Sequence, residues 1–254
     1  MSENDFTGSL PASLSHLTDL RSLDSCDNEL TGTILYDLVE LTNLEIVDIA
    51  RNQFSGTIPQ SMENWTNLAQ FNLADNDFSG FIPSDLGNLS NLSYLGLRQN
   101  HFNGTIPYNL GNLIKLENLH LQENELVGTL PKEIGALTNL LHLRLDYNEL
   151  TGSLPSSLSR LTDMVTFSVL NNEFTGTLPA EFGNLAAVEL LNLQQNLFTG
   201  SIPKKFEEMT SLRELFVSGN NLRGPEAAGL CELGLVRYRA DCSTGCSCCT
   251  PSCT

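Results

Sequence analysis

The chain has 254 residues and a formal net charge of −17, from 13 Lys and Arg against 30 Asp and Glu. Carboxylates repel phosphates, so this charge argues against nucleic acid as a partner and favours basic partners or cations in an encounter. No apolar run approaches the roughly 18 residues that a membrane-spanning helix needs.

The N-terminal stretch MSENDFTGSL has neither the basic start nor the apolar segment of a secretory signal. It also begins in the middle of the repeat described next. We therefore expect an N-terminally truncated chain without an N-terminal cap. Whether a membrane anchor precedes Met1 is an open alternative at this point.

An asparagine recurs every 24 residues along the chain, from Asn4 to Asn220. In all ten units a glycine stands four residues later and Leu or Phe two residues later. Proline stands seven residues later in eight of the ten units, the exceptions being Leu35 and Ala227. Self-similarity at a fixed period of this length is typical of a solenoid of stacked repeats.

Apolar residues fill fixed columns before each asparagine. Leu119 and Leu121, before Asn124, alternate at period two, as in a short strand with one buried face. The segment after the asparagine turns back and points Leu130 and Leu137 inward again. One coil cannot bury its own apolar face, so stability has to come from neighbouring coils.

The repeated polar residues have structural explanations. An asparagine amide supplies both donors and an acceptor to turn backbone without a buried charge. The glycine suits a tight bend, and the proline suits a return segment in which an N–H would have no partner.

The motif L-x-x-L-x-L-x-x-N-x-[LF]-[ST]-G-x-[IL]-P, as in LHLRLDYNELTGSLP, resembles the plant-type leucine-rich repeats of receptor-kinase ectodomains and polygalacturonase-inhibiting proteins. The resemblance covers residues 1–224. It implies an α/β repeat: a right-handed solenoid of about ten 24-residue coils with a parallel sheet on the concave face. It does not identify a ligand, because the repeated positions are the structural ones.

The variable strand positions, six, four, two and one residues before each asparagine, are expected to project from the concave sheet. Tyrosine and arginine, the types that anchor interfaces, gather there in the central coils. The predicted ligand-binding residues are Tyr94, Arg98, His120, Gln122, His142, Arg144, Asp146, Tyr147, Leu170 and Phe216. The alternative for the centre is a self-satisfied network in which Arg144 pairs with Asp146 and Glu123.

Two further sets of side chains leave alternatives open. Leu170, Leu190 and Phe216 make one end of the face apolar, either for a partner or as the seat of the C-terminal tail. Acidic residues line the first coils and the edge after the asparagines, either attracting a basic peptide or Ca²⁺ or forming a solvated edge. These acids are Asp24, Asp27, Asp48 and Asp75 (with Arg51 opposed), and Glu29, Asp77, Glu125, Glu149 and Glu173.

Residues 225–254 leave the repeat pattern and are predicted to form a cysteine-rich C-terminal cap or tail, in which Leu230, Leu233, Leu235 and Val236 cover the open core. We predict disulfides among six cysteines, as in secreted proteins. The alternatives are a soft-metal thiolate cluster and reduced or lipid-modified thiols, although no zinc spacing is present. The six are Cys231, Cys242, Cys246, Cys248, Cys249 and Cys253.

The ending ADCSTGCSCCTPSCT is similar to the cysteine-rich endings of repeat proteins of stramenopile algae, which often carry a membrane anchor before the repeats. The seventh cysteine, Cys26, falls on the concave side and is either free or paired with an upstream segment.

Four glycosylation sequons begin at Asn64, Asn88, Asn91 and Asn103, outside the strand columns. If used, they would leave the concave face bare.

No hydrolase, phosphate-binding or dinucleotide motif is present, and His120 and His142 lack the carboxylate or thiol partners of a metal site. We therefore expect no enzyme, no cofactor and no metal. The leading prediction is a secreted or cell-surface recognition module for a protein, peptide or glycan. The alternatives are an inhibitor of a secreted hydrolase and a structural or ice-binding solenoid, whose hydroxyl ladder is interrupted by Phe81, Asn103 and Val127.

Overall fold

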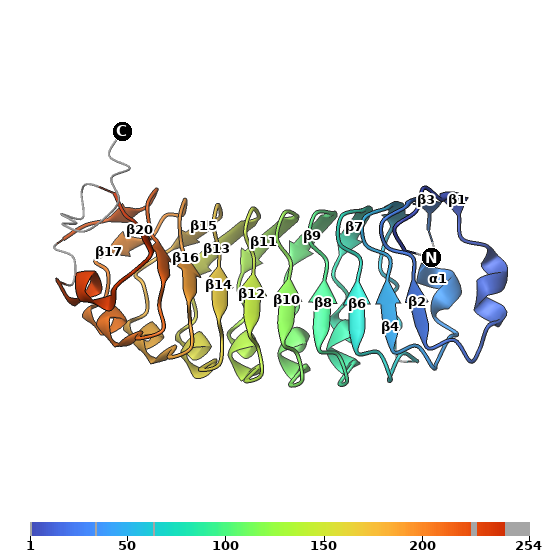
Figure 1. The fold of residues 1–254 in the computed structure, drawn as a ribbon, viewed down its shortest axis with the longest axis horizontal. Coiled ribbons are helices and arrows are strands. Elements are labelled where there is room, and N and C mark those ends of the chain that lie inside the picture. The colour runs from blue at the N-terminus through green and yellow to red at the C-terminus, as the bar shows by residue number, and fades with distance from the viewer. Residues whose placement is uncertain (1, 34, 63, 225–227, 242–254) are drawn as a thin grey trace.

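The computed structural model describes residues 2–33, 35–62, 64–224 and 228–241. Successive coils stack along the long axis of an elongated solenoid, from the blue N-terminal coils at one end to the red C-terminal coils at the other (Figure 1). No helix among these residues is long and apolar enough to span a membrane.

The predicted parallel sheet is confirmed as a ten-stranded sheet, called the concave sheet below. Neighbouring strands are related by one repeat, as in the register Asn118↔His142. Each strand buries its central apolar residue, because the residues on either side of it point to the opposite face. The strands are β2 (Ser22–Asp24), β4 (Ile46–Asp48), β6 (Gln70–Asn72), β8 (Tyr94–Gly96), β10 (Asn118–His120), β12 (His142–Arg144), β14 (Thr166–Ser168), β16 (Leu190–Asn192), β18 (Glu214–Phe216) and β20 (Arg237–Arg239).

A second parallel sheet, called the flank sheet below, lies after the asparagines and was not predicted from the sequence. Its residues are mostly polar, and a glycine within seven of its eight strands, and directly after the eighth, hides the alternation that marks a strand. The eight-stranded flank sheet contains β1 (Thr7–Ser9), β3 (Glu29–Gly32), β5 (Gln53–Gly56), β7 (Asp77–Phe81), β9 (His101–Thr105), β11 (Glu125–Thr129), β13 (Glu149–Ser153) and β15 (Glu173–Thr175). A pair of strands continues it, β17 (Thr199–Gly200) and β19 (Asn221–Leu222).

Short helices form the return side of the solenoid. Prolines such as Pro107 and Pro131, with φ of −65° and −63°, immediately precede 3-10 helices. Where Leu35 takes the proline position, the return segment is instead a single α-helical turn, α1 (Leu35–Leu38). The 3-10 helices are η1 (Ala12–His16), η2 (Ser84–Asn88), η3 (Tyr108–Asn112), η4 (Lys132–Ala136), η5 (Ser156–Arg160), η6 (Ala180–Asn184), η7 (Lys204–Glu208) and η8 (Ala228–Leu233).

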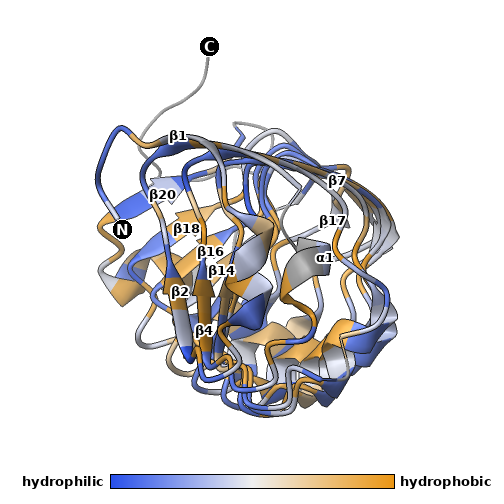
Figure 2. Cartoon of the chain, turned by 90° about the vertical axis from the view of Figure 1, so that its right-hand side faces the viewer, coloured by the Kyte–Doolittle hydropathy of each residue, from blue (hydrophilic) through white to orange (hydrophobic). Residues whose placement is uncertain are grey.

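The core lies between the two sheets and the helices, which form separate walls when the solenoid is viewed along its axis (Figure 2). Its largest residue, Trp65, is fully buried and donates its Nε1–H to the Leu38 carbonyl at 3.0 Å. Aromatic rings from the column two residues after the asparagine stack between coils, with Phe78 and Phe102 centroids 6.4 Å apart. Stacking of coils therefore buries what one coil alone would expose.

The asparagine column makes the hydrogen bonds that its chemistry predicts. The Asn100 Nδ2 group lies within 2.9–3.2 Å of the carbonyls of Leu73, Leu97 and Arg98, and its Oδ1 accepts the Phe78 N–H at 2.9 Å. Because Leu73 and Phe78 belong to the preceding coil, each asparagine joins two coils.

Two features of the return side were not predicted from the sequence. A second asparagine ladder joins the coils there: Asn67 donates to Thr42 O at 3.2 Å and Asn139 donates to Ile114 O at 2.7 Å. Glycine is also required where adjacent helices meet, since a Cβ on Gly135 would lie 2.4 Å from the Ser157 carbonyl oxygen.

At the C-terminal end, η8 and β20 continue the solenoid. Leu230 is buried and Leu233 and Leu235 pack against the core, as predicted. The same prediction is wrong for Val236, which is 68% exposed, because it precedes β20 and its neighbour Leu235 packs against the core instead. The division at residue 224 and the cap stay predictions, since residues 225–227 and 242–254 lie outside the described part.

Candidate binding site on the concave sheet

Most of the predicted binding residues surround one hollow of about 270 Å³ on the concave sheet, called the central hollow below. It extends over β10, β12, β14 and β16 and their C-terminal ends. Its lining residues are Arg98, Gln122, Glu123, Arg144, Asp146, Tyr147, Ser168, Leu170, Leu190 and Asn192. Tyr94, His120 and His142 lie on the strands beside it, whereas Phe216 lies further along the sheet on β18.

The residue immediately before each asparagine adopts a left-handed conformation. Gln99, Glu123 and Tyr147 have φ values of 50°, 59° and 53°. Non-glycine residues rarely adopt this conformation. Here the turn leaves these side chains exposed at the rim of the sheet, and Tyr147 is 47% exposed there. The repeat alone did not indicate this feature.

Tyr94 and His120 pack edge to face on adjacent strands. Their ring centroids lie 5.5 Å apart at an interplanar angle of 80°, and Tyr94 Oη lies 3.4 Å from His120 Nδ1. The tyrosine ring crosses over Gly96, where an added Cβ would lie 2.7 Å from Tyr94 Cε1. Gly96 is buried as a result, and the Tyr94 ring fills the space beside it on the concave face.

The histidines of the centre are held neutral. Burial, followed by the nearby Arg144, His142 and Arg98, lowers the pKa of His120 to about 4. Burial and Arg144 likewise hold the pKa of His142 below its ordinary value. Both side chains therefore present uncharged rings at neutral pH.

The alternative network around Arg144 is not present in the structure. Arg98, not Arg144, forms the ion pair of this region, with Asp75 at 2.7 Å. Asp146 instead accepts hydrogen bonds from the Ser168 hydroxyl and from the Leu170 N–H, the latter at 3.0 Å. Burial raises the pKa of the Asp146 carboxyl despite these donors.

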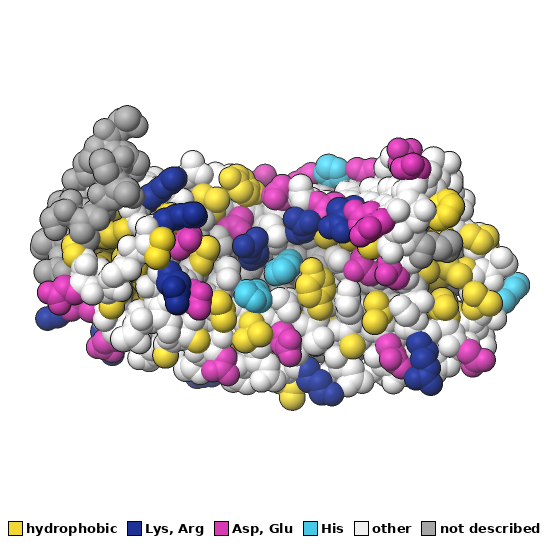
Figure 3. Space-filling view, in the orientation of Figure 1, with side chains coloured by type: hydrophobic (Ala, Val, Ile, Leu, Met, Phe, Trp, Pro, Cys, Tyr) yellow, Lys and Arg dark blue, Asp and Glu magenta, His cyan; other side chains and the backbone are white. Residues whose placement is uncertain are grey.

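Arg144 is exposed and, among the described residues, forms no ion pair. The other described arginines of the sheet are engaged: Arg51 with Asp27, Arg237 with Glu214, and Arg239 over the Phe216 ring. Figure 3 shows basic and histidine side chains gathered in the middle of this face. Arg144 is thus an exposed cation in an acidic protein, although the carboxyl groups of Glu123 and Asp146 also line the central hollow.

The apolar residues of the face have two different surroundings. Leu170 and Leu190 are half-buried and form a wall of the central hollow next to Arg144. Phe216 is covered by Arg239 of β20, whose guanidinium carbon lies 5.9 Å from the ring centroid. A C-terminal residue therefore covers part of the apolar end.

The acidic residues of the first coils mostly have partners. Asp27 pairs with Arg51, which lowers the pKa of the Asp27 carboxyl. Asp48 accepts hydrogen bonds from Gln70 and Asn72 at 3.0 and 3.1 Å. In the described part of the chain, no group of three or more His, Cys, Asp and Glu side chains is arranged to hold a metal ion.

The edge row after the asparagines is bridged by His101. Its Nδ1 lies 3.3 Å from Glu125 and its Nε2 lies 3.9 Å from Asp77.

Cys26 is a free thiol, and burial together with Asp24 raises its pKa to about 12. A thiol with so high a pKa is a poor nucleophile at neutral pH.

Cys231 lies in η8, whereas the other five candidate cysteines lie outside the described residues.

The four sequon asparagines differ in their surroundings. Asn64 and Asn91 donate hydrogen bonds to main-chain carbonyls, at 3.5 Å to Val39 and 2.7 Å to Thr66. Asn88 is exposed at the end of η2, and Asn103 lies on β9 of the flank sheet.

Two family models match the chain: a leucine-rich repeat region over residues 77–175 and a leucine rich repeat over residues 42–102 and 164–222. The chain belongs to the plant-type leucine-rich-repeat proteins. The resemblance inferred from its motif is thereby confirmed. No curated protein matches this leucine-rich-repeat protein.

Solved structures similar to this leucine-rich-repeat protein include plant receptors. A TDR receptor is 36% identical, with a TM-score of 0.88 over 92% of this chain and 41% of that one. The Arabidopsis receptor kinase HAESA, solved with the peptide hormone IDA and the co-receptor SERK1, is 31% identical, with a TM-score of 0.87 over 94% of this chain and 41% of that one. The chain thus spans about two fifths of these receptors' length.

A plant ice-binding protein is 24% identical, with a TM-score of 0.80 over 97% of this chain and 81% of that one. At this identity the likeness shows the fold alone.

Proposed function

We propose that this leucine-rich-repeat protein is a non-catalytic recognition module that binds a protein or peptide segment in the central hollow. The observation that carries the proposal is Arg144, an exposed arginine without an ion-pair partner among the described residues, beside the apolar wall of Leu170 and Leu190. A ligand with a carboxylate next to an apolar side chain would match both features.

Three further observations support this proposal. Tyr147 offers a large exposed ring at the rim of the same hollow, and tyrosine and arginine are the residues that dominate interface energies. The two histidines beside Arg144 are neutral, so they supply hydrogen-bonding groups while Arg144 supplies the positive charge. The similar receptor HAESA was solved with a peptide hormone.

We place the protein in an extracellular or cell-surface compartment. The predicted disulfides among the C-terminal cysteines, of which Cys231 lies in η8, would require an oxidising environment. The four sequons lie off the concave sheet, so glycans on them would leave the proposed binding face accessible.

The test is selection of binders from a random peptide library displayed on phage. The wild type is compared with Arg144→Glu, and Arg160→Glu on the exposed end of η5 is the matched control. We expect the wild type and the control to enrich the same acidic and apolar peptides, and Arg144→Glu to lose them by about tenfold or more.

Peptides that bind Arg144→Glu unchanged would contradict a site in the central hollow. Failure to enrich any peptide would contradict peptide recognition itself. Circular dichroism of the three proteins first establishes that each is folded.

The two alternative functions have weaker support. No feature of the described residues points specifically to a hydrolase as the partner. The hydroxyl ladder of the flank sheet would need a flat regular surface to order ice, whereas Phe81 interrupts it with a side chain that is 64% exposed. Thermal hysteresis in a dilute solution of the protein would restore the ice-binding alternative.

A further inference from the structure

The flank sheet carries one interruption of its hydroxyl ladder, on three consecutive coils. The outward-facing positions three and five residues after the asparagine are mostly Ser or Thr, but Phe81, Asn103 and Val127 replace them on β7, β9 and β11. Phe81 is in register with Asn103, and Thr105 is in register with Val127. The exceptions therefore form a single patch on neighbouring strands.

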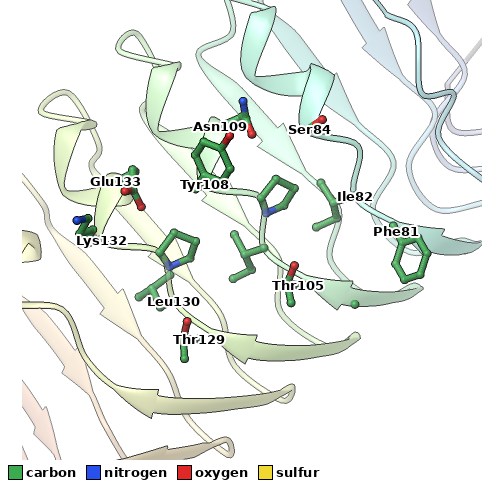
Figure 4. A pocket seen from close by; sticks show the side chains of 14 residues that line it. Phe81, Ile82, Ser84, Thr105, Tyr108, Asn109, Thr129, Leu130, Lys132 and Glu133 are labelled. Atoms are coloured by element: carbon green, nitrogen blue, oxygen red, sulfur yellow. The ribbon is translucent and has the colours of Figure 1, made fainter.

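This patch borders a large hollow between the flank sheet and the return helices, called the flank hollow below. Its volume is about 950 Å³. Phe81 and Tyr108 come from neighbouring coils and are 64% and 65% exposed, with Ile82 between them and Leu130 on the next coil, beyond Tyr108 (Figure 4). Two large aromatic rings exposed next to apolar side chains form a patch of the kind that is usually covered by a bound group.

Asn103 is the group from which such a cover can extend. It begins the sequon Asn103-Gly104-Thr105, and Gly104 and Thr105 line the flank hollow. Asn103 follows the buried Phe102, so its side chain faces outward. The Phe81 ring leans over Gly104, where an added Cβ would lie 2.4 Å from Phe81 Cδ1.

We propose that Asn103 carries an N-linked glycan whose first sugars lie on the Phe81 ring and extend over the flank hollow toward Tyr108. This inference rests on the proposed function, since the modification requires passage through the secretory pathway.

The chemistry of the patch fits a sugar chain. A pyranose presents an apolar C–H face that packs on an aromatic ring, and hydroxyls at its edges that need hydrogen-bonding partners. Thr105, Thr129 and Asn109 supply such partners around the hollow, and Lys132 and Glu133 balance each other in charge. A glycan attached here would also block the flank to a protein partner and leave the concave sheet open.

The other sequons lack this environment. The Asn91 amide is engaged at both ends, donating to Thr66 O at 2.7 Å and accepting from Lys115 Nζ at 2.7 Å. Asn88 is exposed, and neither Leu89 nor Ser90 of its sequon lines the flank hollow, whereas Gly104 and Thr105 do. Asn88 therefore serves as an internal control with a free glycan.

The experiment directs the full chain into the secretory pathway of a eukaryotic host and measures each sequon by glycopeptide mass spectrometry. Release of the glycans from the folded protein by an endoglycosidase is then followed site by site, for the wild type and for Phe81→Thr. The substitution restores the residue type of the neighbouring coils, so the fold is preserved. We expect Asn103 to be occupied, and Phe81→Thr to speed release there about fivefold, the size of one aromatic contact, while release at Asn88 is unchanged.

An unoccupied Asn103 beside an occupied Asn88 would overturn the inference and leave the proposed function intact. Equal release rates at Asn103 in the two proteins would overturn the packing on Phe81. Failure of the folded chain to be glycosylated at any sequon would count against both the inference and the secreted placement. Peptide binding by the central hollow is read separately, since Arg144 is on the other sheet.

Discussion

Tyr94 and His120 form an edge-to-face pair on neighbouring strands, with Tyr94 Oη 3.4 Å from His120 Nδ1. Burial raises the pKa of Tyr94 and lowers that of His120. Both shifts disfavour the charged forms, so the pair is stable as two neutral rings. Proton uptake at this point of the concave sheet therefore opposes folding.

The stability of the protein should depend on this histidine between pH 6.5 and about pH 4. In that window the unfolded chain binds a proton at His120 and the folded chain does not, so the free energy of unfolding falls as the pH falls. The loss attributable to His120 is at most about 3 kcal/mol.

His120→Phe keeps an aromatic ring against Tyr94 and removes the titration. Urea unfolding at several pH values should show wild type and variant diverging below pH 6.5, with a smaller loss in the variant. Parallel profiles of the two proteins would contradict the assignment. His16→Gln, on the exposed η1, should leave the wild-type profile unchanged.

Asn124→Ala should lower the free energy of unfolding by about 3 kcal/mol. Asn124 donates to the carbonyls of Leu97 and Leu121 at 3.0 and 3.1 Å and accepts from the Phe102 N–H at 3.0 Å. The substitution removes the partner of the Phe102 N–H and leaves each carbonyl with a single asparagine donor, from Asn100 and Asn148 respectively. The control Asn118→Ala, on the concave face of β10, should change it by less than about 0.5 kcal/mol. Equal effects in urea unfolding would refute a structural role specific to the repeated asparagine.

Gly135→Ala should destabilise the return side by about 1–3 kcal/mol. The added methyl group would meet the Ser157 carbonyl at 2.4 Å and push two coils apart. Ser159 takes the corresponding position one coil later, so Ser159→Ala should have little effect. The melting temperatures of the two variants are compared with that of the wild type. An unchanged melting temperature for Gly135→Ala would contradict the close packing of the two helices.

Gaining a glycine at a left-handed position before an asparagine should raise the free energy of unfolding, and losing one there should lower it. Gln99 has φ of 50°, and Gln99→Gly is expected to raise stability by up to about 1 kcal/mol, because relief of the backbone outweighs the added freedom of the unfolded chain. Gly219 takes the same position with φ of 73°, and Gly219→Ala should lower stability by about 1 kcal/mol. Changes of the same sign in calorimetric melting would contradict the strain.

Several parts of the candidate binding site were predictable from the spacing alone. The asparagine period places Arg98, Arg144 and Tyr147 on one face of neighbouring strands, and the structure brings these side chains around one hollow. Whether an arginine there is engaged depends on side-chain reach across coils. Arg98 forms an ion pair with Asp75, and Asp146 accepts hydrogen bonds from Ser168 and Leu170. Arg144 therefore stays exposed without a carboxylate partner among the described residues.

The 24-residue period was sufficient for the coil, the concave sheet, the buried columns and the asparagine ladder, because these follow from local chemistry repeated in register. Contacts between coils decided the rest: the flank sheet, the packing at Gly135, the neutral histidines and the grouping of Phe81 with Asn103 and Tyr108. A period states which residues are equivalent, whereas packing of unlike side chains from adjacent coils determines burial, pKa and pairing.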